Sequence, residues 1–508
     1  MKICIICRAE QNDLIKGLAV SKFGDQAVYH ILNKPQIIDL TGTAFVIDHA
    51  VVANVKPYDF RHSDGVYVCF GGQLIGVDEE EQLVALRQEA VREKNWNKAK
   101  HINDVLIDID FLKKNTVSSA YPDYLQIETT SFCNAKCIMC SHYFSNNKGA
   151  QMLKNDTVQH MEDALQLSHT VSLNGMGEPF ASPYVSDQID YYSSLGNRIV
   201  TNTNLSILND RLVAQINTCF DWLEISIDGA TKEIYENIRK NLKLDSIEEN
   251  LKRLKEECPH VRKHIATVIM RQNVKEMPLM VELAHEAGAN IITFMTLNAN
   301  IIIQNSQDEM CNYPKVLQYY SAKALEMGEK LGIPVIVPNA EIMDRAISFE
   351  EIQDELAKME AIPLFKDERE TDQMMHTAKL VEAYLEENNE IQTDTVASSV
   401  KCHGICDWIL KQSYVDLQGN VAMCCRNQSF HVGNVNEAKE FGAVWNSAFY
   451  QKLRQIFYSG YVPEACLKCG LIESGNLKHL SIEMSDDFYK DPAYKVSQKE
   501  KLQGLLKE

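Results

Sequence analysis

Residues 1 to about 77 alternate short apolar runs with turn residues, as in "KICIIC", "AVYHIL", "AFVIDHAVV" and "GVYVCFGGQLIGV". Runs of this length between turn residues predict strands. A helix is predicted from about Asp78 by apolar residues at helical spacing, namely Leu83, Leu86, Ala90 and Val91. We therefore expect residues 1–120 to form a strand-rich α+β domain, and no motif in it indicates its role.

The pattern of apolar and polar residues changes at Tyr124, where six strand-like runs begin to alternate with helical patterns. The runs are "YLQIET", "TVSLNGM", "RIVTNTN", "WLEISIDG", "HIATVIM" and "NIITFMTL". Strands that alternate with helices indicate parallel βα units. Six such units by Leu297 predict an incomplete (β/α)6 barrel over residues 121–340. Barrels of this kind bind their ligands at the C-terminal ends of the strands.

The remainder of the chain divides into three shorter parts. Residues 341–400 are acidic with a helical pattern, which is typical of a solvated helical linker. Residues 401–472 form a small cysteine-bearing unit, in which "DLQGN" predicts a hairpin turn between "SYV" and "VAM". Residues 473–508 form a polar tail. The expected fold class is α/β.

Composition and charge limit the possible partners. The 508 residues include 70 acidic and 51 basic side chains, which gives a net charge of −19. Such a surface repels a phosphate backbone, so we expect no nucleic-acid partner. The apolar run at the start is too short for a signal peptide, and no run approaches the roughly 20 apolar residues of a membrane span. We expect a cytoplasmic protein without a membrane partner, whose 15 cysteines serve metal ligation or catalysis rather than disulfides.

The segment "ETTSFCNAKCIMCSHYF" follows the first barrel strand and contains Cys133, Cys137 and Cys140 in a C-x3-C-x2-C pattern. Three thiolates in one loop can wrap an iron–sulfur cubane and leave one iron open for a substrate or cosubstrate. The alternative is a zinc site with His142 as fourth ligand, although zinc more often uses two separated pairs of ligands.

This segment resembles the signature of the radical S-adenosylmethionine (SAM) superfamily, C-x3-C-x-aromatic-C, with Met139 in the aromatic position. The resemblance implies a [4Fe–4S] cluster whose open iron binds SAM, and Met139 packed against the adenine. It implies reductive cleavage of SAM to a 5′-deoxyadenosyl radical, which abstracts a hydrogen atom from the substrate. It also implies an external reductant such as flavodoxin or ferredoxin.

Three further stretches at predicted strand ends strengthen the resemblance. "NGMGEP" resembles the Gly-Gly-Glu-Pro motif that binds the SAM amino group, and "TNTN" and "ISIDGATKEIYENIRK" follow in the expected order. The SAM contacts implied by resemblance are Gly175, Gly177, Glu178, Asn202, Ser226, Asp228 and Arg239. A tight turn explains the glycines equally well, and Arg239 has the alternative of lying on a helix face. Arg271 in "VIMRQN" is a further candidate of the same kind.

A second cysteine group lies in "CDWILKQSYVDLQGNVAMCC" and "CLKC", and consists of Cys406, Cys424, Cys466 and Cys469. Four thiolates close a cubane completely. The pattern resembles the SPASM/twitch extension of radical SAM enzymes. No cysteine follows Cys469, which implies the twitch form with one auxiliary [4Fe–4S] cluster. A zinc ribbon is the alternative. Two neighbouring cysteines, Cys402 and Cys425, are either bystanders or hydrogen-atom donors to a product radical.

These features together predict a radical SAM enzyme that acts on a small molecule or a peptide. We rank oxidation (dehydrogenation) first, because the resemblance includes a twitch alcohol dehydrogenase whose auxiliary cluster could accept an electron. The alternatives are a radical epimerase and an enzyme that modifies ribosomally made peptides. A different class also remains open, that of a non-catalytic iron–sulfur protein for electron transfer or sensing.

Overall fold

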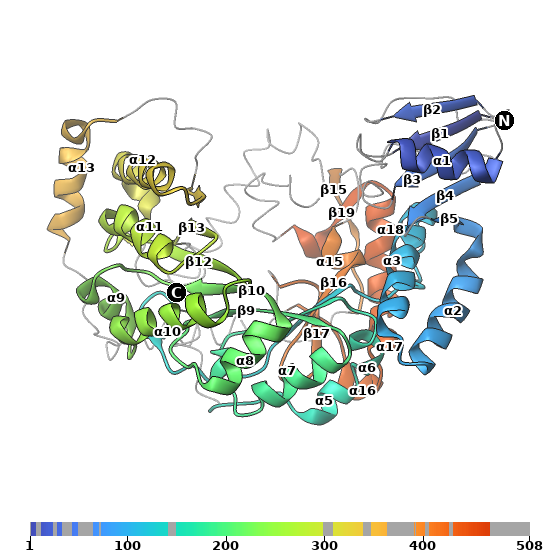
Figure 1. Ribbon diagram of the computed structural model, residues 1–508, viewed down its shortest axis with the longest axis horizontal. Coiled ribbons are helices and arrows are strands. Elements are labelled where there is room, and N and C mark those ends of the chain that lie inside the picture. The colour runs from blue at the N-terminus through green and yellow to red at the C-terminus, as the bar shows by residue number, and fades with distance from the viewer. Residues whose placement is uncertain are drawn as a thin grey trace.

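The fold was analysed in a computed structural model (Figure 1). It describes residues 2–6, 12–23, 28–32, 43–48, 65–70, 73–140, 149–297, 308–338, 347–362, 391, 393–401, 406–425 and 430–467. No helix within these segments has the length and apolar character needed to cross a membrane.

The N-terminal strands form one five-stranded sheet in the order β2-β1-β3-β4-β5. Its members are β1 (Lys2–Ile6), β2 (Val28–Leu32), β3 (Thr43–Asp48), β4 (Gly65–Phe70) and β5 (Gln73–Gly76). The first four are parallel, and β5 pairs antiparallel with β4. The predicted strands are therefore present. The sequence analysis missed a helix, α1 (Asn12–Phe23), which connects β1 to β2 and buries Ile15 and Ala19.

Two helices follow, where a single helix was predicted from about Asp78. A 3-10 turn, η4 (Val77–Glu79), leads into α2 (Glu80–Arg92), and α3 (Trp96–Lys113) packs against α2. Leu83 and Ala90 are buried as predicted, but Leu86 is 43% exposed. Leu86 belongs to the apolar stripe that predicted the helix but lies outside the core, and Arg87 lies on the buried face instead. The Arg87 guanidinium donates to Asn103 Oδ1 at 2.9 Å and to the Ser119 carbonyl at 2.8 Å.

The central sheet contains the six predicted barrel strands in sequence order, all parallel. They are β6 (Tyr124–Ile127), β8 (Thr170–Ser172), β9 (Arg198–Thr203), β10 (Phe220–Ser226), β12 (Arg262–Ile269) and β13 (Ile291–Thr296). A short seventh parallel strand, β14 (Val335–Ile336), extends the edge beyond β13. The prediction of a partial (β/α)6 barrel is confirmed.

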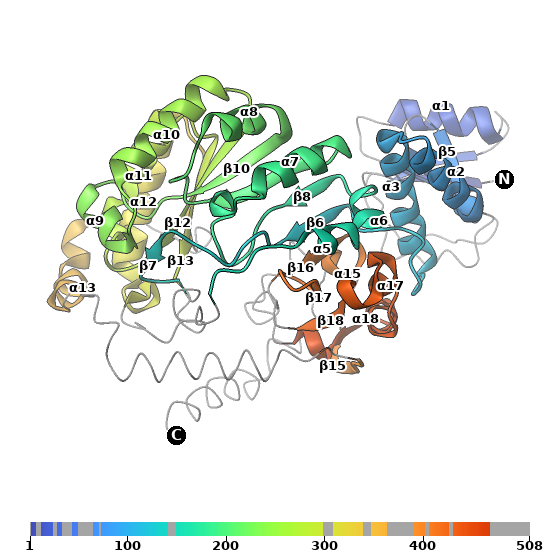
Figure 2. The ribbon, with the colours of Figure 1, turned by 90° about the horizontal axis from the view of Figure 1, so that it is seen from below.

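Helices cover one face of this sheet (Figures 1 and 2). The covering helices are α7 (Val185–Ser194), α8 (Asp210–Cys219), α10 (Leu244–Glu257), α11 (Met277–Glu286) and α12 (Pro314–Leu331). Strand residues directed at them, such as Leu223, Ile265 and Ile292, are fully buried. Alternate residues on the same strands are half-buried or exposed, and they define the opposite, lumen face of the sheet.

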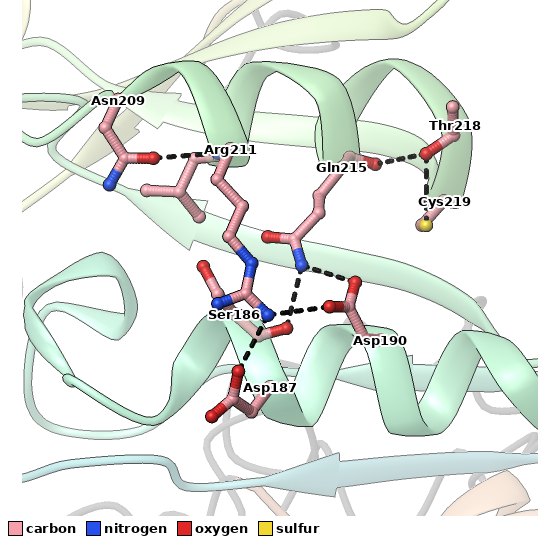
Figure 3. Close-up of polar contacts among 9 residues, drawn as sticks. Ser186, Asp187, Asp190, Asn209, Arg211, Gln215, Thr218 and Cys219 are labelled. Carbon is pink, nitrogen blue, oxygen red and sulfur yellow. Dashed lines mark hydrogen bonds and ion pairs between the residues drawn. The ribbon is translucent and has the colours of Figure 1, made fainter.

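Neighbouring helices are also joined at the surface, as Figure 3 shows for α7 and α8. Arg211 on α8 reaches Asp187 and Asp190 on α7, each at 2.7 Å. Gln215 donates to the Ser186 carbonyl at 2.7 Å and to Asp190 at 2.6 Å. These contacts lie on an exposed face, so they contribute little to stability compared with the apolar core beneath them.

Short elements fill the connections of the barrel. They are β7 (Lys136–Cys137), α5 (Asn155–Gln159), α6 (Glu162–Leu165), η5 (Pro179–Ala181), α9 (Lys232–Ile238), β11 (Arg239–Lys240), η6 (Val274–Glu276) and η8 (Met310–Asn312). After the barrel, α13 (Phe349–Ala361) lies within the predicted acidic helical linker and packs against α12.

The C-terminal unit continues the barrel sheet. β16 (Gln412–Val415) pairs parallel with β6, and β17 (Asn420–Ala422) and β18 (His431–Asn434) follow antiparallel. The result is one ten-stranded sheet. The predicted hairpin between "SYV" and "VAM" is confirmed, and Gly419 in its turn has φ = +82°, which favours glycine.

Helices and a small second sheet complete this unit (Figure 2). The helices are α15 (Asp407–Leu410), α16 (Val435–Ala438), α17 (Phe441–Trp445), α18 (Ala448–Tyr458) and the turn η10 (Glu464–Cys466). The second sheet consists of β15 (Ala397–Lys401) and β19 (Tyr461–Pro463). The fully buried side chains of the C-terminal unit include Trp445, Tyr450 and Phe457. The unit therefore has an aromatic core, which is continuous with the core of the barrel.

Candidate functional site

The first cysteine group lies in the loop that leaves β6, at the C-terminal end of the barrel strands. Cys137 is buried, and Cys133 and Cys140 are half-buried. The two-residue strand β7 pairs antiparallel with β11 and sets Cys137 opposite Arg239. The Ile138 amide donates to the Ile238 carbonyl at 3.0 Å. The cysteine loop is therefore attached to the chain that follows α9.

The "GMGEP" segment packs directly on the cysteine loop. A Cβ atom at Gly177 would lie 2.3 Å from the Thr130 carbonyl oxygen and 2.5 Å from that of Phe132. The Glu178 amide donates to the same Phe132 carbonyl at 2.9 Å. Gly177 is therefore required by a close backbone approach between two loops, and its contact with SAM, like that of Gly175, stays a prediction.

Glu178 uses its carboxylate to hold the end of β9. The buried side chain accepts hydrogen bonds from the Thr203 hydroxyl at 2.6 Å and the Asn204 amide at 2.8 Å. Burial raises the pKa of this carboxyl, and the hydrogen bonds oppose that effect. The arrangement fixes three loops at the barrel mouth relative to one another, and a SAM contact by Glu178 stays a prediction.

Asp228 and Arg239 form a buried ion pair beside the cysteines. Arg239 Nε lies 2.7 Å from Asp228 Oδ2, and the Val268 amide donates to Asp228 Oδ1 at 2.8 Å. Arg239 Nη1 lies 3.8 Å from Cys137 Sγ. Arg239 is thus held by the site rather than exposed on a helix face, and its contact with SAM stays a prediction.

Burial raises the pKa of Cys137 to about 12 and that of Cys133 to about 11. The positive charge of Arg239 opposes this effect, because it lowers the pKa of both thiols. Thiols that are difficult to ionise alone become thiolates when metal binds, and a neighbouring cation stabilises that form. The donor set of Cys133, Cys137 and Cys140 therefore fits a thiolate-bound cluster.

The remaining predicted SAM residues lie around the same end of the barrel. Met139 packs on a small apolar cluster with Ile138, Ile238 and Met270. Ser226 is half-buried on β10, and the Asn202 side chain is exposed on β9. Their contacts with SAM stay predictions.

Arg271 does not serve as a free cation at the site. Its Nε lies 2.9 Å from Asp308, and its Nη1 donates to the carbonyls of Met359 and Ile362. The buried guanidinium joins the end of β12 to α13, and a contact of Arg271 with the SAM carboxylate stays a prediction.

The second cysteine group comes from three segments of the C-terminal unit. Cys406 precedes α15, Cys424 follows β17, and Cys466 ends η10, and all three adjoin the same apolar core. Cys469 and Cys402 lie outside the described residues. The shared cluster of Cys406, Cys424, Cys466 and Cys469 stays a prediction.

Cys424 and Cys425 lie close to different tyrosines. Burial raises the pKa of Tyr450, in the core of the C-terminal unit, and the Cys424 charge adds to that effect. Burial likewise raises the pKa of Tyr124, and the Cys425 charge adds to it. Cys424 packs against the apolar core of the C-terminal unit, and Cys425 lies close enough to Tyr124 and Tyr414 to add to the rise that burial causes in the pKa of both phenols.

One group of possible single-ion ligands is present among the described residues. The ligand atoms of His101, Asp104 and His169 all lie within 4.8 Å of one another, beside the start of β8 and so at the end opposite the cysteine loop. No three described cysteine sulfurs lie as close as this.

Sequence reasoning missed several polar residues that build the site. Asn134, within the cysteine loop, donates to the Ser206 hydroxyl at 2.8 Å and accepts from Asn204 at 3.1 Å. Buried Glu128 accepts from the Met176 amide at 2.7 Å. All are polar residues at the C-terminal ends of barrel strands, and that position was the available signal.

Comparison with known proteins agrees with this geometry. Residues 127–284 match the family model described as the radical SAM superfamily, and residues 406–470 match that of an iron–sulfur cluster-binding domain, SPASM. A curated relative is the AdoMet-dependent heme synthase of Methanosarcina barkeri, 27% identical over 174 residues, which are 33% of this chain. The match spans about half, 48%, of that relative's length.

Solved structures give weaker matches. Streptococcus suis SuiB bound to the precursor peptide SuiA has a TM-score of 0.45 and 15% identity, over 74% of this chain and 75% of that one. Native anSMEcpe with bound AdoMet has a TM-score of 0.43 and 14% identity, over 68% of this chain and 86% of that one.

The two family matches fall on the two cysteine groups and imply a [4Fe–4S] cluster that works with SAM and an auxiliary cluster. The chain therefore contains a radical SAM domain over residues 127–284 and a SPASM iron–sulfur domain over residues 406–470.

Proposed function

We propose that the protein is a radical SAM oxidoreductase that removes hydrogen from a small-molecule or peptide substrate. The observation that carries the proposal is the contact between the cysteine loop and the "GMGEP" loop at the barrel mouth, where Gly177 lies against the Thr130 and Phe132 carbonyls and the Glu178 amide donates to Phe132. Cys133, Cys137 and Cys140 would hold the first cluster, which with SAM supplies a hydrogen-abstracting 5′-deoxyadenosyl radical. Cys406, Cys424, Cys466 and Cys469 would hold the auxiliary cluster.

The residues of this chain would then prepare the site for that chemistry. Gly177 allows the SAM-binding backbone to approach the cysteine loop. The Asp228–Arg239 pair holds a cation near Cys137 without leaving a net buried charge. Met139 would cover the adenine with an apolar surface. Flavodoxin or ferredoxin would supply the electron.

The test is SAM cleavage by the anaerobically reconstituted protein with a chemical reductant. We expect 5′-deoxyadenosine to form, and about eight irons per chain, as two cubanes require. Replacement of Cys133, Cys137 and Cys140 by Ala should abolish cleavage and halve the iron. The matched control replaces Cys219 and Cys258, which lie outside both groups, and should leave both values unchanged. Cleavage that survives the first replacement would refute the assignment, and persistence of SAM intact in the wild type would favour an electron-transfer protein.

A radical epimerase is the second candidate, and the half-buried thiol of Cys425 close to Tyr124 favours it. An epimerase needs a hydrogen donor on the far face of the substrate radical, and a thiol is suited to that task. In deuterated water an epimerase with a thiol donor should place deuterium at the abstracted carbon. A dehydrogenase should not, because that carbon becomes a carbonyl or imine. Deuterium that disappears in a Cys402→Ser, Cys425→Ser double variant would replace the oxidation proposal by epimerisation.

A further inference from the structure

A continuous row of hydrogen-bonded side chains crosses the lumen face of the barrel sheet. Its members, the lumen row, are Asn174, Asn202, Glu224, His264 and Thr293. We propose that the lumen row binds the substrate, that the Glu224–His264 pair is its centre, and that the site selects substrates bearing hydroxyl or amino groups over anions. This inference rests on the proposed function, because it assigns a substrate class to the same barrel.

The row passes through five consecutive segments without a break. Asn174 Nδ2 donates to Asn202 Oδ1 at 3.0 Å, and Asn202 Nδ2 donates to Glu224 Oε1 at 2.6 Å. The other carboxylate oxygen, Oε2, lies 3.1 Å from His264 Nδ1. His264 Nε2 lies 2.8 Å from the Thr293 hydroxyl. The strand register explains the row, because Asn202, Glu224 and His264 are aligned across β9, β10 and β12.

The row lies on the face of the sheet opposite the helix-covered core, and its side chains are partly accessible to solvent. The side chain of His264 is 20% exposed and that of Glu224 is 17% exposed, and Asn202 is exposed. Their strand neighbours Leu223, Ile225 and Ile265 are fully buried. A network that served only to fill a core would have no reason to keep these polar atoms within reach of solvent.

Aromatic rings border the row. The Trp222 ring stacks on His264 with centroids 5.7 Å apart and planes 24° apart. Tyr124, on β6, lies close enough to Glu224 for the carboxylate to add to the rise that burial causes in the pKa of the Tyr124 hydroxyl. Such rings offer a flat apolar surface to the carbon skeleton of a ligand whose polar groups meet the row.

The arrangement of the pair suits a neutral His264 to accept a proton. In the tautomer whose hydrogen lies on Nδ1 and is directed at Glu224, Nε2 can accept from the Thr293 hydroxyl. A substrate hydroxyl or ammonium group can take the place of Thr293 and donate to Nε2. The neighbouring carboxylate stabilises the imidazolium if the proton is transferred.

Charge decides between classes of substrate. The lumen row contains one carboxylate and no lysine or arginine. Glu224 therefore attracts an amine and repels a phosphate or carboxylate group. The amide groups of Asn174 and Asn202 both donate and accept, which suits hydroxyl groups. The chemistry of the row fits a neutral or cationic substrate with neighbouring hydroxyl or amino groups.

The test is a fluorescence titration of the anaerobic holoprotein with three probes, 2-amino-1,3-propanediol, myo-inositol and glycerol 3-phosphate. Trp222→Phe identifies the part of the signal that arises beside His264. We expect the amine and the polyol to change this signal, and the phosphate to bind at least tenfold more weakly than the amine. Glu224→Gln and His264→Gln should each weaken amine binding at least tenfold. Glu224→Gln should also reduce the difference in affinity between the amine and the phosphate.

Matched controls are Glu257→Gln on α10 and His260→Gln, which lie outside the row and should bind the probes as the wild type does. The proposal is overturned if the phosphate binds as tightly as the amine, if no probe alters the Trp222 signal, or if the row variants behave like the controls. The titration needs neither reductant nor SAM cleavage, so its failure is separate from an absence of 5′-deoxyadenosine, which would count against the proposed function.

Discussion

Four buried ionisable side chains lie around the cysteine loop, and they are balanced in different ways. Arg239 and Asp228 neutralise each other at 2.7 Å. Glu178 accepts hydrogen bonds from the chain that ends β9. Glu128 accepts from the Met176 amide at 2.7 Å and from the Leu417 backbone, and burial raises its pKa to about 7. Because buried charge is costly unless paired, these residues have the largest single-residue effects on the site.

Removal of Arg239 should be far more destabilising than removal of a surface arginine. Arg239→Gln leaves Asp228 buried without its partner, and we expect a loss of about 3 kcal/mol in the free energy of unfolding. Arg211→Gln, which breaks the exposed pairs with Asp187 and Asp190 in Figure 3, should cost less than about 1 kcal/mol.

Urea denaturation followed by circular dichroism measures both values. The double variant Asp228→Asn, Arg239→Gln should recover part of the loss, because it removes the unpaired charge. Equal losses for Arg239→Gln and Arg211→Gln would show that the buried pair contributes no more than a surface pair.

Glu128 should make stability depend on pH near neutrality. Its folded pKa of about 7 lies above the ordinary value of 4.5 for a glutamate, so the folded state holds the proton more tightly. The stabilisation is present at low pH and is lost as pH rises through about 7. Between pH 6 and pH 8 the loss is about 1 kcal/mol. Glu128→Gln keeps an acceptor for the Met176 amide and should lack this dependence.

The measurement compares urea midpoints of the wild type and Glu128→Gln at pH 6 and pH 8. The urea midpoint of the variant should increase relative to that of the wild type as the pH rises. A constant difference between the two proteins across this range would mean that Glu128 does not titrate there.

At the scale of elements, the site depends on contacts between loops that leave different strands. The loops after β6 and β8 touch at Gly177, and the β7–β11 pair holds the other side of the cysteine loop. None of these contacts lies within one helix or strand. A small change at a loop contact should therefore disturb the cluster site while the surrounding barrel stays folded.

Gly177→Ala tests this contact. The added methyl group would meet the backbone oxygens of Thr130 and Phe132, which cannot move as a flexible side chain does. We expect the variant to fold with an unchanged far-ultraviolet spectrum but to bind about half of the wild-type iron, because the first cluster is lost. Gly76→Ala, whose nearest neighbour is the flexible Glu79 side chain at 3.1 Å, is the control and should keep its iron. Full iron content in Gly177→Ala would contradict the loop contact.

At the scale of the whole molecule, the barrel and the C-terminal unit share one sheet and one core. The parallel pairing of β6 with β16 joins strands nearly 300 residues apart, from Tyr124↔Gln412 to Ile127↔Val415. Buried Arg454 on α18 also joins the C-terminal unit to the chain that precedes β6, because it donates to the Thr116 carbonyl at 3.0 Å. The two cysteine groups are therefore held by a common framework.

We expect β6 and β16 to open together. Arg454→Met leaves buried carbonyls without donors, at a cost of about 1–3 kcal/mol for each. Hydrogen exchange should accelerate in β6 and β16 to a similar degree, while β12 and β13, far along the sheet, change less. Faster exchange in β16 alone would show that the C-terminal unit unfolds independently of the barrel.

The sequence by itself determined the local elements and the chemistry of the cysteines. Alternation and helical spacing predicted the six barrel strands, because side-chain periodicity depends on the backbone of each segment alone. The spacing of Cys133, Cys137 and Cys140 indicated a cluster with an open iron for a similar reason, since one short loop supplies all three ligands. The hairpin at Gly419 likewise follows from neighbouring residues.

Only the tertiary structure decided which distant residues meet. The pairing of Arg239 with Asp228, the engagement of Arg271 by Asp308 and the addition of β16 to β6 join segments that no local pattern connects. The lumen row is the clearest case, because Asn202, Glu224 and His264 belong to three strands and become neighbours only through the strand register. Register is set by the packing of the whole sheet against its helices, and that is a property of the assembled core rather than of any segment.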